Sequence, residues 1–271
     1  MKKISLNEGK AILLDILKRF NNYCNQNDMK MILAAGTCLG AVRHKGMIPW
    51  DDDIDVFLLK EDFDKLMKLA QNDGFLDQEK RFKIVVPGSE NYYYPFIKIV
   101  DTHTILYEKN IRRDLSLGLY IDVFCLSYWP DDFNECLRLD KLQKKYRKLN
   151  QILICGNIED RKYKLIYPFA YIIQKIFLIN PKNIGYFSKK ILQLDTYKNT
   201  AYIGDVCWNM GVNKDRFKKE MFDDLILLDF EDEKYYVPKD YDQYLTIMYG
   251  NYMKLPDEKD RRSHGFEAYY L

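Results

Sequence analysis

The sequence predicts an α+β protein in which strands and helices are mixed up to residue 130 and helices dominate after it. One observation is an amphipathic helix that begins at Leu6, because Ser5 and Glu8 form a capping box and apolar residues follow on one helical face. Another is a series of short apolar runs bounded by turn residues, which is typical of strands. A third is the basic, helical pattern that runs from Asp131 to about Gln151.

The elements can be placed in chain order from these patterns. The first helix is predicted to end near Asn27, where Asn and Asp supply a stop signal. After it we expect strands at 30–35, 53–59, 82–86, 94–101 and 119–124, a loop at 36–49, and a helix at 61–72. The second half is predicted to contain the helix at 131–151, a hairpin with strands at 225–230 and 235–237, and a helix at 240–249. We therefore expect a mixed part at 1–130 and a mainly helical part at 131–271.

Composition argues against several classes of protein. The net charge is +2, from 42 basic and 40 acidic residues, so there is no bulk electrostatic basis for nucleic-acid binding. The six cysteines show no short C-x-x-C spacing, so we expect reduced thiols in a cytoplasmic protein. Near the N-terminus, Asp15, Lys18 and Arg19 interrupt the apolar positions, which argues against a signal peptide.

The run DDDID at residues 51–55 places four carboxylates immediately before an apolar strand. Alternate side chains of a strand share a face, so Asp51, Asp53 and Asp55 are expected to point the same way. Two carboxylates two residues apart at the mouth of a strand can bind a hard divalent cation through oxygen ligands. The alternative interpretation is a solvated acidic turn, and the acidic run alone does not decide between them.

Three neighbouring features favour a site over a solvated turn. Gly36-Thr37 follows the preceding predicted strand, where the backbone of a glycine and a hydroxyl can approach a phosphate. The basic run at 43–45 supplies donors for phosphate oxygens. Asp122 stands alone among the apolar residues of its predicted strand, where a carboxylate is costly unless it is paired or metal-bound.

These motifs resemble a known family. Gly36-Thr37, Asp53-x-Asp55 and a later Asp122 match the pattern of the nucleotidyltransferase fold. The longer run AAGTCLGAVRHKGMIPWDDDIDV resembles the LicD family of phosphocholine transferases, to which fukutin-related proteins are distantly similar. The run YYVPKDYDQYLTIMYGNYMKLPD is similar to the tail of that family, so the resemblance spans nearly the whole chain. Thr37 and Asp53 lie farther apart than in most nucleotidyltransferases, and the basic insert between them is typical of this branch.

The resemblance implies a fold, a metal site and a base. The fold is a nucleotidyltransferase-like mixed sheet with flanking helices, with a catalytic core at 1–130 and an acceptor-side subdomain and returning tail at 131–271. Asp53, Asp55 and Asp122 are implied to hold magnesium, as two ions, with Mn²⁺ as a substitute. Asp122 is expected to act either as a general base or as the third metal ligand, and the sequence does not separate these roles.

The resemblance also implies residues that contact phosphate. We expect Gly36, Thr37, Arg43 and Lys98 to bind the diphosphate of the substrate, with Arg43 also contributing to catalysis. For Lys98 the alternative is a lysine that reaches solvent from an edge strand.

The implied activity is transfer of phosphocholine from CDP-choline to a sugar hydroxyl, with CMP leaving. The acceptor would be a lipid-linked or soluble cell-surface glycan precursor of the teichoic acid or lipopolysaccharide type. Rival hypotheses are a CDP-ribitol or CDP-glycerol donor, nucleotidyl transfer from a nucleoside triphosphate, and a catalytically inactive binding module. Choline would need aromatic faces around its quaternary ammonium. Candidates for such a cage are Trp50, Trp129, Trp208 and the tyrosines at 92–94.

The most apolar segment of the chain lies at 163–179. It is short for a transmembrane helix and is interrupted by Pro168 and by polar residues, which argues against a membrane span. A buried helix is one interpretation. The other is a peripheral element, flanked by lysines, that rests on anionic lipid at the inner face of the membrane.

Overall fold

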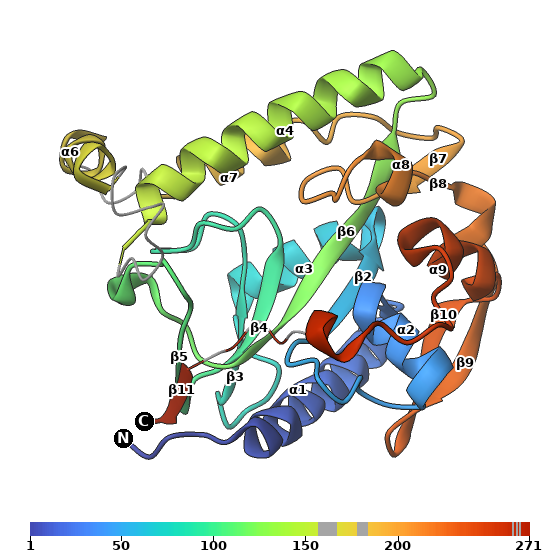
Figure 1. Ribbon diagram of the computed structural model, residues 1–271, viewed down its shortest axis with the longest axis horizontal. Helices are drawn as coiled ribbons and strands as arrows, with labels where there is room; N and C mark the ends of the chain where they lie inside the picture. The colour runs from blue at the N-terminus through green and yellow to red at the C-terminus, as the bar shows by residue number, and fades with distance from the viewer. Residues whose placement is uncertain (157–166, 178–183, 262, 264, 266) are drawn as a thin grey trace.

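The computed structural model describes residues 1–156, 167–177, 184–261, 263, 265 and 267–271 (Figure 1). The helices are α1 Leu6–Gln26, α2 Ala35–His44, α3 Lys60–Asn72, α4 Phe133–Ile154, α6 Tyr167–Phe177, α7 Tyr186–Leu192, α8 Val212–Asp215 and α9 Tyr241–Tyr249. The strands are β1 Ile32–Leu33, β2 Asp55–Leu59, β3 Phe82–Val85, β4 Ile97–Asp101, β5 Thr104–Tyr107, β6 Tyr120–Trp129, β7 Tyr202–Gly204, β8 Phe217–Lys218, β9 Leu225–Phe230, β10 Glu233–Pro238 and β11 Glu267–Tyr270. Short 3₁₀ turns lie at Arg113–Leu115, Lys219–Phe222 and Glu258–Asp260.

A mixed sheet in the order β3-β4-β6-β2-β1-β10-β9 forms the centre of the molecule. β2 runs parallel to β6, and β1 runs parallel to β10, whereas the other pairs on this path are antiparallel. The far end of the long strand β6 pairs with β7, which in turn pairs with β8. Helices flank this mixed sheet, so the predicted α+β, nucleotidyltransferase-like class is confirmed.

Helix α1 covers one face of the sheet because its apolar residues recur at helical spacing. Its N-terminus has the predicted capping box, in which the Ser5 amide donates to Glu8 Oε2 at 2.9 Å and the Glu8 amide donates to Ser5 Oγ at 3.3 Å. Ile16, Leu17 and Phe20 are fully buried in the main core. This packing leaves the other face of β2, β4 and β6 for a pocket.

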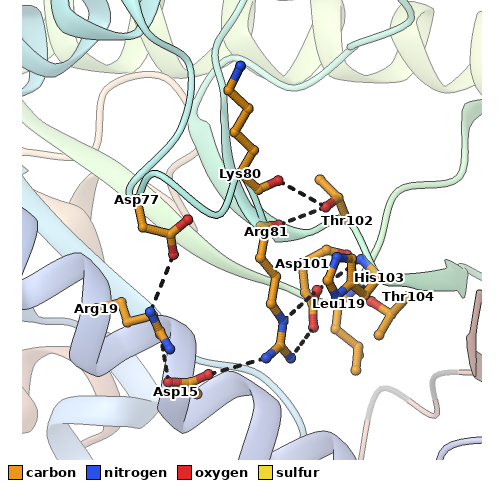
Figure 2. A network of polar contacts seen from close by, with 10 residues as sticks. All are labelled: Asp15, Arg19, Asp77, Lys80, Arg81, Asp101, Thr102, His103, Thr104 and Leu119. Carbon is orange, nitrogen blue, oxygen red and sulfur yellow. Dashed lines mark hydrogen bonds and ion pairs between the residues drawn. The ribbon is translucent and has the colours of Figure 1, made fainter.

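Polar contacts fix α1 beneath the β3–β4 hairpin (Figure 2). The Arg81 guanidinium makes two hydrogen bonds to the fully buried carboxylate of Asp101, at 3.2 and 2.8 Å. Arg81 also lies 3.7 Å from Asp15 of α1, and Asp15 accepts from Arg19 at 3.0 Å. Paired geometry of this kind gives a buried carboxylate the charge compensation it needs. The network therefore anchors the end of β4, the strand that carries Lys98.

The part of the chain after residue 130 contributes both helices and strands. Helix α4 lies along one side of the molecule, with α7 beside it and α6 near its C-terminal end (Figure 1). β9 and β10 join the main sheet, and β11 pairs with β5 near the N-terminus. The tail is held there because the Ile4 amide donates to the Ala268 carbonyl at 2.9 Å. The two ends of the chain therefore lie side by side.

The structure differs from the predicted elements mainly around residue 35. The strand expected at 30–35 is only β1, and helix α2 occupies 35–44, where a loop was predicted. Strands β5, β7, β8 and β11 were not predicted. Each has at most four residues, and so short a run gives little alternation to detect. The six cysteines are free thiols and are buried, as expected. Among the described residues, no helix is both long and apolar enough to cross a membrane.

Candidate active site

A pocket of about 710 Å³ opens over the face of the sheet that carries Asp55, Lys98 and Asp122. Its floor is formed by alternate residues of β6, namely Tyr120, Asp122 and Phe124, whose neighbours Ile121 and Val123 are buried in the main core. Residues of α4 and of the segment at 205–215 form the opposite wall. Because the two faces of β6 are divided between core and pocket, the alternation of the sequence directly places Asp122 in the pocket.

Three charged side chains lie in register across the floor. Lys98 of β4 is paired with Asp122 of β6, and Asp122 is paired in turn with Asp55 of β2. Side chains that are in register on neighbouring strands point to the same face of a sheet. Lys98 Nζ lies 2.6 Å from Asp122 Oδ1, which makes a charge-assisted contact within the row. The row therefore consists of one cation, Lys98, followed by the two acidic residues Asp122 and Asp55.

Asp55 carries the least compensated charge in this row. Burial raises the pKa of its carboxyl well above the usual value, and the nearby Asp53, Asp122 and Asp51 raise it further, while Lys98 opposes the shift. Its backbone is fixed from below, because the Asp55 amide donates to Thr37 Oγ1 at 2.9 Å. The site therefore holds a carboxylate in a position that a nearby positive charge would stabilise.

The carboxylates before β2 gather beside this row. Asp51, Asp52 and Asp53 form a group whose carboxylate oxygens lie within 4.8 Å of one another, in the part of the chain that the structure describes. Asp52 is buried and accepts from the Gly265 amide of the C-terminal tail at 2.9 Å. A Cβ atom at Gly36 would lie 3.0 Å from Asp51 Oδ2, so a glycine lets the start of α2 approach the acids. Oxygen donors at this density fit a hard divalent cation.

Comparison with known proteins connects this geometry to a family. The family model described as "LicD/FKTN/FKRP, nucleotidyltransferase domain" matches residues 28–110. The lipopolysaccharide cholinephosphotransferase LicD of Haemophilus influenzae is 29% identical over 280 residues, and the match covers the whole of both chains. These matches identify LicD as the family that this chain resembles. Uncharacterized proteins of Rickettsia typhi and Rickettsia prowazekii are each 40% identical over 63 residues, covering 23% of this chain and 20% and 24% of theirs.

The Gly36-Thr37 pair lies in the first turn of α2 and does not end a strand. Thr37 is buried, and its hydroxyl holds the backbone of Asp55. The sequence prediction of direct phosphate contact by this pair stays a prediction. What the geometry adds is a positioning contact between the start of α2 and β2, the strand that carries Asp55.

Arg43 lies at the other end of α2, apart from the described residues that line the pocket. Its Nη1 donates to the Tyr252 carbonyl at 2.6 Å, and its Nε donates to His44 Nε2 at 3.0 Å. Burial lowers the pKa of the Arg43 guanidinium. In this arrangement Arg43 fixes the segment after α9, and its predicted contact with phosphate remains untested.

Lys98 lies in an interior strand, so the alternative of a lysine reaching solvent from an edge strand is wrong. Its side chain is only 1% exposed. In addition to Asp122, its ammonium faces the rings of Tyr94, Phe96 and Tyr120, with distances to the ring centroids of 4.5, 5.2 and 3.2 Å. These contacts compensate a buried cation in the floor of the pocket.

The opposite wall of the pocket was missed by sequence reasoning. Arg147 of α4 stacks on Trp208, with the guanidinium carbon 3.8 Å from the ring centroid, and Nη1 donates to the Asn209 carbonyl at 3.2 Å. In the described part of the chain, Arg147 has no carboxylate within 4.0 Å. Lys144, one turn earlier, also lines the pocket but is paired with Asp140 at 2.7 Å. The i, i+3 spacing of these two cations indicates that they share one face of a helix. No neighbouring residue in the sequence indicates that this face lines the pocket.

Two buried acids, Asp205 and Asp215, belong to the same wall of the pocket as Arg147. Burial raises the pKa of Asp205 to about 7 and that of Asp215 to about 6. Nearby Asp215 raises the pKa of Asp205 further, whereas backbone hydrogen bonds from Trp208 and Cys207 and the charge of Arg147 oppose the shift. This wall is therefore polar and sensitive to pH near neutrality.

The predicted aromatic candidates divide into two groups. Tyr94 and Trp208 line the pocket, with ring centroids 5.5 Å apart in an edge-to-face arrangement. Trp129 is buried in a separate cluster, and Trp50 lies beside His44 at 6.0 Å. The remaining candidates, Tyr92 and Tyr93, are buried. His264 of the C-terminal tail lies outside the described residues.

Proposed function

We propose that this protein is a phosphotransferase that moves phosphocholine from CDP-choline to a sugar hydroxyl of a cell-surface glycan precursor. One observation carries the proposal: Asp55 and Asp122 lie in register on the pocket floor of a chain that matches LicD of Haemophilus influenzae over its whole length. That relative is named a lipopolysaccharide cholinephosphotransferase, which supports a glycan of the lipopolysaccharide type as acceptor. We place the reaction in the cytoplasm, where CDP-linked donors are consumed, with a lipid-linked or soluble acceptor.

The proposed cofactor is magnesium, as two ions, with manganese as a substitute. Asp53, Asp55 and Asp122 would hold it, and the raised pKa of Asp55 among like charges supports this donor set. Bound there, magnesium would neutralise charge on the diphosphate and on the entering and leaving oxygens. Asp122 lies 2.6 Å from Lys98 and would serve either as a metal ligand or as a general base, since both roles use a carboxylate oxygen.

In the proposed reaction the acceptor oxygen attacks the phosphorus that carries choline. The bond from this phosphorus to the bridging oxygen breaks, and CMP leaves with the electron pair. The acceptor proton passes to solvent, directly or through a pocket carboxylate. Residues of this chain contribute by position: Thr37 fixes the backbone of Asp55, and Arg147 offers guanidinium donors from the facing wall.

The head group of the donor would lie toward the aromatic end of the pocket. Tyr94 and Trp208 offer ring surfaces there, and Glu108, which accepts from the Tyr94 hydroxyl at 2.7 Å, adds negative charge. A quaternary ammonium binds through aromatic faces and nearby carboxylates, because it has no hydrogen to donate. A polyol donor would instead need hydrogen-bonding groups at that end.

The test is to follow CDP-choline by ³¹P NMR with lipopolysaccharide as acceptor, in magnesium and in excess EDTA. We expect CMP and a new phosphodiester signal only with magnesium and acceptor present. CDP-ribitol, CDP-glycerol and CTP serve as competing donors, and Asp55→Asn serves as the inactive control. Faster turnover of a polyol donor would replace the choline assignment, and pyrophosphate release from CTP would indicate nucleotidyl transfer. No turnover of any donor would favour an inactive binding module.

A further inference from the structure

Helix α6 turns its apolar side to solvent. Large apolar residues that are 44–71% exposed follow one another around this helix of 11 residues. They are Phe169, Tyr171, Ile172, Ile173 and Ile176. Four of them fall at the i, i+3, i+4, i+7 spacing that normally marks the buried face of a helix. Apolar groups gathered in this way on a surface indicate an interaction site.

The orientation of α6 is fixed by its polar side, which faces the protein. Gln174 is buried, and its Nε2 donates to the carbonyls of Ile152 and Cys155 at the end of α4, at 2.8 and 2.9 Å. Ala170, one turn earlier, is buried on the same side. Rotating the helix to bury its isoleucines would break these hydrogen bonds. The outward position of the apolar residues is therefore built into the packing.

Helix α7 extends this surface with aromatic and basic residues. Phe177 of α6 and Tyr186 of α7 lie with ring centroids 5.7 Å apart. Tyr186 is 42% exposed, and Lys190 lies over its ring at 5.8 Å. On α6, Lys175 lies over Tyr171 at 5.3 Å. We call the exposed residues of α6 together with Tyr186, Lys189 and Lys190 the α6 surface.

The sequence around the α6 surface carries charge of one sign. Residues 161–194 contain seven lysines and arginines and no aspartate or glutamate. The chain as a whole is nearly balanced, with 42 basic and 40 acidic residues. A segment that combines apolar side chains, tyrosines and only positive charge is complementary to a surface with an apolar interior and an anionic outer layer.

We propose that the α6 surface binds an anionic lipid bilayer and lies in its interface. Among the described residues no helix is long and apolar enough to cross a membrane, so α6 would rest in the head-group region with its isoleucines in the acyl boundary. A second copy of this chain is a poorer occupant, because a two-fold contact would place lysines against lysines. The inference is independent of which donor or acceptor the pocket uses.

Helix α4 connects the α6 surface to the pocket. It carries Lys144 and Arg147 on the pocket wall, and its last turn holds α6 through the carbonyl of Ile152. Ile152 lies five positions after Arg147 in this helix, a rise of about 7.5 Å. Binding at the α6 surface would therefore fix the distance between the pocket wall and the membrane surface.

The experiment is co-sedimentation of the full chain with vesicles of phosphatidylcholine alone and with about one third phosphatidylglycerol. We expect the wild type to bind the anionic vesicles and to be released at high salt, because lysine–lipid attraction is screened. The double variant Ile172→Ser/Ile176→Ser should bind about tenfold more weakly, and Lys189→Gln/Lys190→Gln should weaken binding and reduce its salt dependence. The matched control is Leu227→Ser on β9, whose side chain is similarly exposed and lies outside the α6 surface.

Three results would overturn the proposal. Absence of wild-type binding to anionic vesicles removes the lipid partner. Equal binding by the double isoleucine variant and by Leu227→Ser removes α6 as the contact. A wild-type dimer in light scattering that the isoleucine variant makes monomeric would assign the surface to contact between copies. Because Ile172, Ile176, Lys189 and Leu227 are exposed and Lys190 is only half-buried, thermal melting should confirm that each variant is folded.

Discussion

Lys98 and Asp122 face each other across β4 and β6, with Nζ 2.6 Å from Oδ1 and the lysine almost fully buried. The buried ammonium of Lys98 therefore relies on the Asp122 carboxylate for charge compensation. Replacing Lys98 by Met should lower the free energy of unfolding by about 3–5 kcal/mol, as expected for breaking one side of a buried pair. Urea denaturation measures this change.

The control for this pair is the double variant Lys98→Met/Asp122→Asn. It removes both charges and should recover part of the lost stability, giving a favourable coupling energy in a double-mutant cycle. If Lys98→Met is as stable as the wild type, the pair contributes nothing and Lys98 would be free to serve the substrate alone.

Asp55→Asn should abolish turnover without unfolding the protein. Desolvation and then the nearby carboxylates raise the pKa of this half-buried carboxyl, so replacing it by a neutral amide relieves repulsion in metal-free buffer. We expect an unchanged or raised melting temperature, and a stabilising effect of magnesium in the wild type that the variant lacks. Asp229→Asn, at an exposed position of β9, is the matched control. Near wild-type activity in Asp55→Asn would remove this residue from the metal site.

Thr37 should matter through the backbone of Asp55. Thr37→Val keeps the shape of the side chain but removes the acceptor of the Asp55 amide, which costs about 1–3 kcal/mol for a buried unsatisfied donor. Thr37→Ser keeps the hydroxyl and should retain most activity and stability. Chemical denaturation and kcat measured together test this. Equal loss in both variants would point to the methyl group and not to the hydrogen bond.

Arg147 and Arg43 make a matched pair of arginine variants. Arg147 lines the pocket and stacks on Trp208, whereas Arg43 binds the Tyr252 carbonyl. Arg147→Lys should weaken CDP-choline binding about tenfold, since lysine loses both the planar fork and the stacking. Arg43→Lys should mainly lower the melting temperature. Quenching of tryptophan fluorescence during CDP-choline titration measures the affinities, and the reverse ranking would restore Arg43 as the phosphate contact.

Asp205 should make stability depend on pH. Its pKa is raised to about 7 in the folded protein, so the folded state binds more protons than the unfolded state between about pH 4 and pH 7. Stability is therefore lost as pH rises through this window, at no more than about 1.4 kcal/mol per pH unit from this group.

Asp205→Asn removes that titration while keeping an oxygen that can accept from the Cys207 and Trp208 amides. Denaturation at pH 5 and pH 7.5 should show a smaller loss of stability in the variant than in the wild type. Parallel pH profiles for the two proteins would mean that Asp205 is ionised in the folded state throughout.

Sequence reasoning succeeded where the signal is local. The capping box fixed the start of α1, and the alternation of LYIDVF placed Asp122 on the opposite face from Ile121 and Val123. It failed for α2, whose sequence AGTCLGAVRH holds two glycines and little helical signal. A Cβ at Gly40 would lie 2.5 Å from the Gly46 carbonyl, so the glycine serves a close approach that only the folded chain reveals. Tertiary packing overrides propensity here.

The far wall of the pocket shows a second kind of limit. Arg147 and Trp208 lie far apart along the chain, yet the guanidinium stacks on the indole. No spacing rule links a residue in the middle of a basic helix to a tryptophan in a later loop. The sequence could therefore place the carboxylates, which are close together in a strand, but not the cation that faces them.

The parallel pairing of β1 with β10 has a consequence for synthesis of the chain. Ile32 meets Tyr236, more than two hundred residues later, so the sheet cannot close until the ribosome has released nearly the whole protein. Contacts of such high sequence separation fold slowly and leave a strand edge open in the meantime. We therefore expect a chaperone to bind the nascent N-terminal half, in which the edge of β1 that later pairs with β10 is still unpaired. A fragment ending before β9 should aggregate and should not form a small stable domain.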